Sequence, residues 1–274
     1  MFQADWLQYS RILAGMVSVD LAGFFYTVRE KFIDTAARLG SRGLIYGVLL
    51  PVIGAPQSYI GIYFAGAVFA AGMFEFSGTV ASLVSEMELG DGMSFELVMP
   101  VTQKLTYIKA LCSHIFRSIT SSLLALMFAK IILWNGFDLS NMSVIKLVIS
   151  LFSIHLLTGS FSLWSATFVY DVSDITLIRR ALLHPFYFLG GHMFPWHVAY
   201  AAIPKFLSYL LLVNPFMFAT ESIRAALLGQ KLFISFWICL VPIFGFSGLL
   251  LFLGWRRFTR RIDLLRGEYR GGCQ

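Results

Sequence analysis

The stretch LFISFWICLVPIFGFSGLLLFLGW, residues Leu232–Trp255, contains no charged side chain and is followed at once by RRFTRR. A helix of about 20 apolar residues crosses a hydrocarbon layer of roughly 30 Å. Arginines directly after such a stretch are typical of the cytoplasmic side of a membrane. This stretch therefore predicts a transmembrane helix.

The composition agrees with a membrane protein. Hydrophobic residues make up 58% of the chain and charged residues 13%, whereas soluble domains average roughly 45–50% and about 25%. The formal net charge of +6 fits cytoplasmic loops and contacts with anionic lipid in such a chain, and we expect no nucleic-acid partner. The three cysteines, Cys112, Cys239 and Cys273, have no disulfide or metal-site spacing.

Five further apolar stretches predict five further spans, so that six spans use nearly all of the 274 residues. They are residues 39–53, 59–84, 108–134, 144–170 and 175–194. We predict an all-α integral membrane protein with three parts: a cytoplasmic N-terminal segment (1–38), a six-span domain (39–255) and a basic cytoplasmic tail (256–274). No separate soluble domain fits.

The segment from Asp20 to Leu39 predicts an amphipathic helix. Its apolar residues recur at helical spacing, and its polar residues share the opposite face, namely Asp20, Thr27, Lys31, Asp34 and Arg38. Such a helix is typical of one that lies in the membrane interface. A solvated loop before the first span is the alternative.

Helix-breaking residues follow the start of the fifth apolar run. They are Pro185, Gly190, Gly191, Pro195 and Pro204, all before Asn214. Irregular backbone at membrane depth survives only where protein or water covers it. We therefore predict re-entrant half-helices between the fifth and sixth spans.

Basic residues indicate the orientation. Lys and Arg concentrate before the first span, between the second and third, after the fourth and after the sixth, whereas residues 51–58 and 135–143 contain none. Because basic loops stay in the cytoplasm, both termini are predicted to be cytoplasmic.

The chain lacks the motifs of common catalytic and nucleotide sites. No stretch matches the phosphate-binding G-x-x-x-x-G-K-[ST] loop, and H-E-x-x-H and G-x-S-x-G are absent. We expect no catalytic residue and no metal site in this chain. His192 and His197 could form an outer metal or proton site, although packing is the simpler interpretation. The ionisable residues within predicted spans are functional candidates, namely Glu75, Lys130 and His155, and of these Glu75 is the candidate for the transport path.

The segment SEMELGDGMSFELVMPVTQKLTYIKALC, residues 85–112, follows the second span. An acidic, glycine-broken part precedes a short helix near Met93, then a proline and a basic return to the membrane. We interpret it as a docking site for a motor subunit, with a plain connecting loop as the alternative. The docking candidates are Glu86, Glu88, Met93, Glu96, Pro100 and Lys104.

With these segments in this order, the chain resembles ABC transporter permeases of the type 2 exporter class. The most specific part is Phe194-Pro195 followed by NPFMFATESIRAALLG, which starts at Asn214. The resemblance implies an outer gate made by Asn214, Pro215, Glu221 and Arg224. The segment VREKFIDTAARLGSRGLIYGVLLPVIG, residues 28–54, is similar to the first segment of capsular polysaccharide and O-antigen exporters. It implies an interface helix that includes Arg29, Glu30 and Lys31.

The resemblance also implies how the chain works. Two copies would pair as a homodimer in the bacterial inner membrane, and a separate ATPase subunit would hold ATP and Mg²⁺, so that this chain binds no cofactor. Polysaccharide or glycolipid would pass a path for which the candidates are Glu75, Phe186, Tyr187 and Phe188. Drug or lipid exporters of the same class remain open. An ion-coupled secondary transporter or an intramembrane enzyme would need clustered acids or a nucleophile with its base.

Overall fold

The computed structural model describes residues 2–54, 56, 58–88, 103–133, 136–169, 174–230 and 232–271. The N-terminal half contains α1 (Phe2–Arg42), the π-helical η1 (Gly43–Leu49), α2 (Leu50–Val52), α3 (Ser58–Met73), α4 (Phe76–Glu88) and α6 (Gln103–Leu133). The remainder contains α7 (Val144–Ala166), α8 (Asp174–Ile178), the π-helical η2 (Arg179–Leu183), α9 (His184–Leu189), α10 (Trp196–Ala202), α11 (Lys205–Leu211), α12 (Pro215–Leu227) and α13 (Phe236–Gly271).

Every regular element in the described residues is helical, and five helical stretches are long and apolar enough to cross a membrane. The pair α11–α12, bent by 84°, makes a sixth if it is counted as one span. A helix satisfies its own backbone polar groups, which is why apolar segments of this length cross lipid in this form. The predicted all-α integral membrane fold is confirmed.

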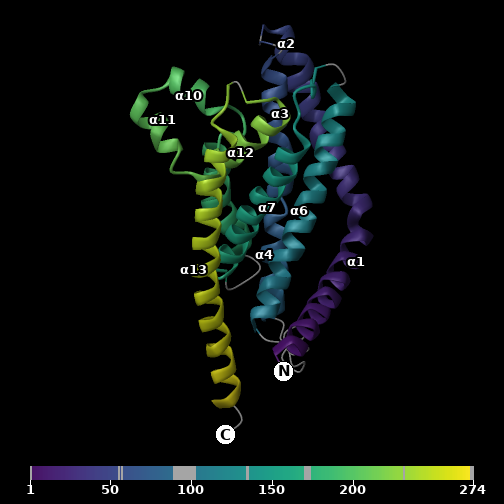
Figure 1. Cartoon of the computed structure of the whole chain (residues 1–274), viewed down its shortest axis with the longest axis vertical. Helices are drawn as coiled ribbons and strands as arrows, with labels where there is room; N and C mark the ends of the chain where they lie inside the picture. Colours follow the sequence, from purple (N-terminus) through teal and green to yellow (C-terminus); the bar gives the residue numbers. More distant parts are fainter. Residues whose placement is uncertain are drawn as a thin grey trace.

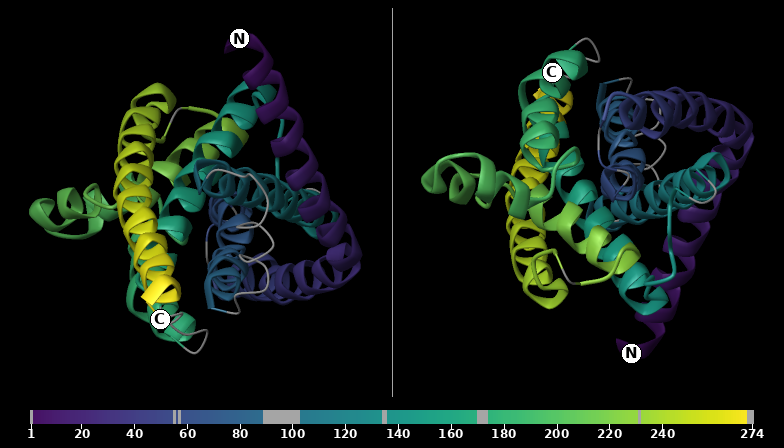
Figure 2. Two further views of the ribbon diagram at one scale, coloured as in Figure 1. Left: turned by 90° about the horizontal axis from the view of Figure 1, so that it is seen from below. Right: turned by 90° about the horizontal axis from the view of Figure 1, so that it is seen from above.

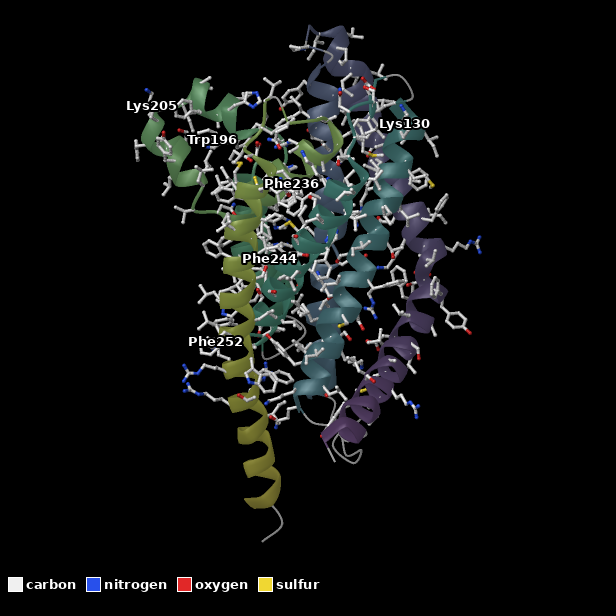
Figure 3. All side chains as sticks on the ribbon, viewed as in Figure 1. Lys130, Trp196, Lys205, Phe236, Phe244 and Phe252 are labelled. Carbon is white, nitrogen blue, oxygen red and sulfur yellow. The ribbon has the colours of Figure 1, made fainter. Side chains whose placement is uncertain are left out.

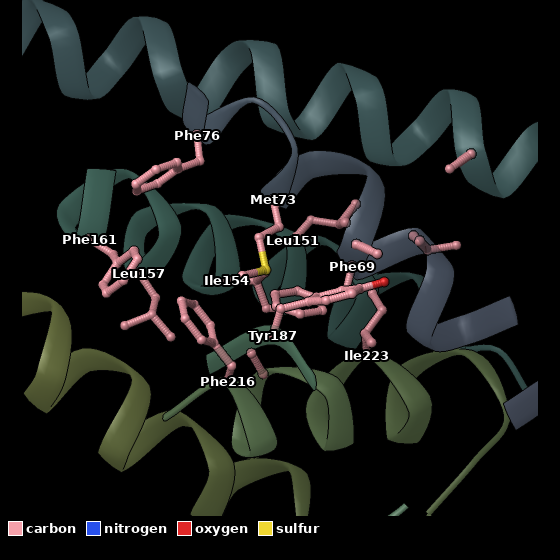
Figure 4. Packing of buried hydrophobic residues seen from close by; sticks show 14 of the residues in the cluster. Phe69, Met73, Phe76, Leu151, Ile154, Leu157, Phe161, Tyr187, Phe216 and Ile223 are labelled. Carbon is pink, nitrogen blue, oxygen red and sulfur yellow. The ribbon is translucent and has the colours of Figure 1, made fainter. Parts of the chain in front are cut away.

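The core lies where α3, α4, α7 and α12 meet (Figure 4). Helix α7 packs against α13, α12, α6 and α4. Side chains from four elements fill the space between them, including Phe69, Phe76, Leu157, Phe161 and Phe216. All residues of α12 except Phe218 are buried, so that this helix is enclosed by protein and not by lipid.

Helix α1 differs from the predicted arrangement of an interface helix followed by a separate span from Leu39. No break separates the two, and α1 continues through η1 and α2 to Val52. Its candidate membrane-crossing stretch is Tyr9–Leu49. The absence of proline between Phe2 and Leu50 lets the helix continue. Figure 1 shows α1 running along one side of the bundle, beside α6.

The polar and apolar faces of α1 are both divided between the bundle and the outside. Among the polar residues, Lys31 is partly buried, whereas Asp34 and Arg38 are exposed. Tyr26 is 90% exposed, Phe25 62% and Ile33 58%, whereas Phe24, on the same side as Lys31, is 3% exposed. An interface helix directs its polar face to water. Here part of the polar stripe, namely Lys31, Asp34 and Arg38, lines a cavity of the protein.

Two other predicted spans are interrupted. The second span is divided into α3 and α4 by a turn at Phe74 and Glu75. The stretch predicted as the fifth span forms α8, η2 and α9 and is not among the five candidate spans. It ends at Leu189 and not at Phe194, because Gly190 and Gly191 follow and Gly191 has a φ of +71°. Short helices α10 and α11 then project from one end of the bundle before the chain turns back as α12 (Figures 1 and 2).

The last span also differs in length. Helix α13 does not end near Trp255 but continues to Gly271, so that the predicted basic tail is helical over most of its length. Figure 1 shows the N- and C-termini at the same end of the bundle, opposite α2, α10 and α11. This arrangement agrees with an even number of crossings.

Candidate functional site

The predicted gate residues lie in α12 and around it. Asn214 caps the helix: its Oδ1 accepts a hydrogen bond from Phe216 N at 3.0 Å, and its Nδ2 donates to Phe186 O at 2.6 Å. Pro215 occupies the first turn, where a missing N–H costs nothing. The Asn-Pro pair therefore starts α12 and ties it to the end of α9.

Arg224 is fully buried, and all five of its N–H groups find acceptors. Nε donates to Ile62 O at 3.2 Å, and Nη2 donates to Gly191 O at 2.6 Å and to His192 O at 3.0 Å. Nη1 donates to Phe194 O at 3.2 Å and to Glu221 Oε1 at 3.4 Å. We call this set of contacts the Arg224 clamp. It joins α12 to α3 and to the Gly-rich turn after α9.

Glu221 is also fully buried. Oε1 accepts a hydrogen bond from Trp196 N at 3.0 Å, and Oε2 accepts one from Ile234 N at 3.1 Å. The carboxylate therefore holds the start of α10 and the segment before α13, and Figure 3 shows Trp196 at that end of the molecule. Because a buried charge is stable only when it is paired and hydrogen-bonded, the Glu221–Arg224 pair is a structural joint of five chain segments.

A second polar site lies between α1 and the α3–α4 turn. Lys31 Nζ is 2.5 Å from Glu75 Oε2, and Ser121 Oγ donates to Glu75 Oε1 at 2.8 Å. The side chains of Lys31 and Glu75 are 25% and 15% exposed. An interface-helix candidate and a path candidate, 44 residues apart in the sequence, are thus an ion pair.

The pair opens into a cavity of about 240 Å³, which we call the α1 cavity. Its lining comes from α1, α3, α4, α6 and the turn between α3 and α4, and it includes Lys31, Asp34, Arg38, Arg42, Phe74 and Glu75. The Arg38 guanidinium lies 4.9 Å from the centre of the Phe74 ring, and Arg38 Nε is 2.8 Å from Asp34 Oδ1. The cavity is therefore polar, with an aromatic wall.

The three aromatic path candidates point in different directions, because neighbouring residues on a helix are about 100° apart. Phe186 packs into the core against Phe161 and Phe216. Tyr187 contacts Phe74 on the side of the α1 cavity, and Phe188 is 52% exposed. Of the three, only Tyr187 contacts Phe74, the residue that precedes Glu75 in the wall of the α1 cavity.

A hydroxyl and histidine network in the bundle was missed by the sequence reasoning. His114 contacts Thr79 at 2.8 Å and Thr158 at 3.1 Å, and Ser122 contacts His155 at 2.9 Å. Ser113 also donates to Asp20 on α1 at 2.7 Å. Four serines of α6 lie within ten residues of one another, and this concentration was the available signal. They are Ser113, Ser118, Ser121 and Ser122.

The motor-docking candidates are placed only in part. Met93, Glu96 and Pro100 lie outside the described residues. Glu86 and Glu88 belong to the last turn of α4, and Lys104 is exposed in the first turn of α6. Arg29 and Glu30 are exposed on α1. Figure 1 shows the end of α4 and the start of α6 at the end of the bundle that carries the termini.

Histidines and acids do not gather into a metal centre in the described part of the chain. His192 stacks on Tyr187, with ring centres 3.8 Å apart, and His197 lies near Phe233. Lys130, labelled in Figure 3, donates to Phe137 O at 2.9 Å and so holds the turn after α6.

These helices define a multi-pass, all-helical membrane protein whose chain folds back into its own bundle at one end. A family profile described as ABC-2 type transporter matches residues 23–228, and the chain belongs to that family. The matched region begins inside α1 and ends after α12, so that it includes both the α1 cavity and the Arg224 clamp. No curated protein matches the chain. The family identifies the chain as a permease subunit of an ABC exporter, whose partner is an ABC ATPase subunit.

Proposed function

We propose that this permease exports a polysaccharide or glycolipid and that it does so as a homodimer in the bacterial inner membrane. The observation that carries the proposal is the polar stripe of α1: Lys31, Asp34 and Arg38 line a cavity with Phe74 in the wall. Sugars offer hydroxyl groups for polar side chains and apolar faces that stack on aromatic rings. The α1 cavity offers both kinds of contact.

The proposed roles follow the two ends of the bundle. The end that carries the termini would face the cytoplasm and dock the ATPase through Glu86, Glu88, Met93, Glu96, Pro100 and Lys104. The opposite end would hold the gate around Asn214, Pro215, Glu221 and Arg224. In this proposal the Arg224 clamp fixes the position of the gate, and Glu75 and Tyr187 face the path. ATP and Mg²⁺ act through the partner subunit.

Reconstitution tests this function. The chain is placed in proteoliposomes with and without a candidate ATPase subunit, and uptake of labelled polysaccharide, glycolipid and drug panels is measured. We expect vanadate-sensitive transport of the saccharide-bearing panel when both subunits are present. Equal transport without the ATPase would contradict ATP-driven export, and transport of the drug panel alone would contradict the proposed cargo.

Motor docking is tested separately by charge reversal. The Glu96→Lys/Lys104→Glu double variant is expected to weaken co-purification with the ATPase, because Glu96 lies in the proposed docking helix and Lys104 follows it. The matched control is Lys146→Glu, near the start of α7 at the opposite end of the bundle. An undiminished complex in the double variant would contradict the assignment of residues 85–104 as the docking segment.

A further inference from the structure

We propose that the α1 cavity binds an oxyanion, a phosphate or a carboxylate, carried by the cargo, and that Glu75 occupies the site of this group in its absence. The inference deepens the proposed function by naming the charge of the cargo. It rests on the geometry of α1 and on the balance of charges around the cavity.

The cations form one stripe. Lys31, Arg38 and Arg42 lie within about 40° of one another around α1, because each residue advances the helix by about 100°. All three line the cavity. They extend along roughly 16 Å of helix, at 1.5 Å per residue, and so form a row that an extended anionic group can follow.

The charges in the cavity do not balance. Its lining holds three cations and two carboxylates. Glu75 pairs with Lys31, and Asp34 pairs with Arg38. Arg42 has no carboxylate partner within the described residues, and it is only partly exposed. Ionisable groups at membrane depth are costly unless they are paired. A bound oxyanion supplies the missing negative charge.

The aromatic side chains near Arg42 add a second observation. Tyr187 is 6% exposed, and its buried hydroxyl has no hydrogen-bond partner within the described part of the chain. Arg42 is close enough to the hydroxyl to influence it electrostatically. Tyr46, one turn beyond Arg42, stacks on Tyr63 with ring centres 3.7 Å apart. A donor hydroxyl beside a guanidinium suits an oxygen-rich anion.

The size of the cavity limits what it can hold. At about 240 Å³ it is smaller than the roughly 300–1,000 Å³ of pockets that enclose a drug-sized ligand. It therefore fits one charged headgroup or one sugar unit at a time. The ligand chemistry is an oxyanion, which comes either from a phosphate headgroup or from an acidic sugar.

Changes at Glu75 and Lys31 are expected to alter ligand affinity in opposite directions, and this makes the proposal testable. Because its carboxylate already pairs with Lys31, an incoming oxyanion competes with Glu75 for that cation. Removing the charge of Lys31 weakens ligand binding, and removing the charge of Glu75 strengthens it. A purely structural ion pair gives the same sign for both changes.

The experiment measures binding to the full chain in phosphatidylcholine nanodiscs, without ATP or ATPase. The probes are glycerol phosphate and a hexuronate trisaccharide, with glycerol and a neutral glucose trisaccharide as uncharged counterparts. We expect one or both anions to bind while the neutral counterparts do not. Glycerol phosphate alone identifies a headgroup as the source, and the hexuronate alone identifies an acidic sugar.

The variants locate the site. Lys31→Gln and Arg42→Gln are expected to raise the Kd at least tenfold, the size expected for loss of a charge-assisted hydrogen bond. Glu75→Gln is expected to lower the Kd. Arg256→Gln, a change on α13 outside the cavity, is the matched control and should leave the Kd unchanged.

Three results would overturn the proposal: no binding of either anion, binding that survives both cation changes, or weaker binding in Glu75→Gln. Because no ATPase is present, such a failure leaves ATP-driven export of a neutral cargo intact. Conversely, a chain that binds anions but shows no vanadate-sensitive transport contradicts the export function alone.

Discussion

Replacing Arg224 by methionine removes the centre of the clamp while keeping a long side chain. The change removes one donor from each of four backbone carbonyls, those of Ile62, Gly191, His192 and Phe194. Of these, Gly191 O keeps the hydrogen bond from Phe194 N. It also leaves the fully buried carboxylate of Glu221 with only two backbone N–H donors. Breaking a buried pair by removing one partner costs about 3–5 kcal/mol. We expect a loss of that size in the free energy of unfolding.

The assay is equilibrium unfolding in mixed detergent micelles, with tryptophan fluorescence as the probe. Glu221→Gln is the informative comparison, because Arg224 keeps its four backbone acceptors. The 3.4 Å contact loses the charge of the carboxylate, and one backbone N–H, that of Trp196 or Ile234, loses its acceptor to the amide group. That variant should lose less than Arg224→Met. Arg256→Met, on an exposed part of α13, should stay within about 0.5 kcal/mol of the parent. A loss below about 1 kcal/mol in Arg224→Met, or a larger loss in Glu221→Gln, would refute the clamp as described.

Two further predictions concern backbone contacts and pH. In Gly66→Ala the new Cβ would lie 2.2 Å from His192 O, so we expect the free energy of unfolding to fall by about 1–3 kcal/mol. The same unfolding assay measures this loss. Gly78→Ala is the control and should show no loss, because the space around its Cβ is open. Hydrogen bonds from Ser140 N–H and Oγ lower the pKa of Asp138 below its ordinary value of 3.8. Because the pKa is lowered in the folded state, the ionised carboxylate stabilises the turn at pH values above 3.8. This stabilisation is lost as the pH falls through the lower, folded-state pKa. Hydrogen exchange at the Ser140 amide should therefore quicken in strong acid in the parent, and an Asp138→Asn variant that shows the same acid dependence would contradict this cause.

Hydropathy predicted the spans because lipid imposes a length and an apolar composition on each helix separately. It could not predict which way α1 faces. The spacing of Lys31, Arg38 and Arg42 shows that a polar stripe exists, yet the same stripe suits water outside the protein or a cavity inside it. What decides between them is the exposure of Phe25 and Tyr26, and this depends on where α6 packs.

The Arg224 clamp shows a second limit of sequence reasoning. The spacing of Glu221 and Arg224 placed both side chains on one face of a helix and marked them as important. Four of the five acceptors of Arg224 are backbone carbonyls. Every residue type carries a carbonyl, so these partners leave no trace in the sequence. A joint of several segments could therefore not be distinguished from a gate that faces the path.

The two polar sites differ in how firmly they hold the chain, and this difference indicates where movement will occur. The Glu221–Arg224 pair joins five segments, and both of its side chains are fully buried. Helix α1, in contrast, packs mainly along α6, and the partly exposed Lys31–Glu75 pair connects it to the α3–α4 turn. A hydrogen bond to a charged group contributes about 1.5–3 kcal/mol, less than the ~3–5 kcal/mol expected for the clamp. If ATP binding in a partner moves one part of this bundle against the rest, we expect α1 to separate from α4 before α12 leaves α3, since the α1 contact is the weaker one and an incoming oxyanion can replace it.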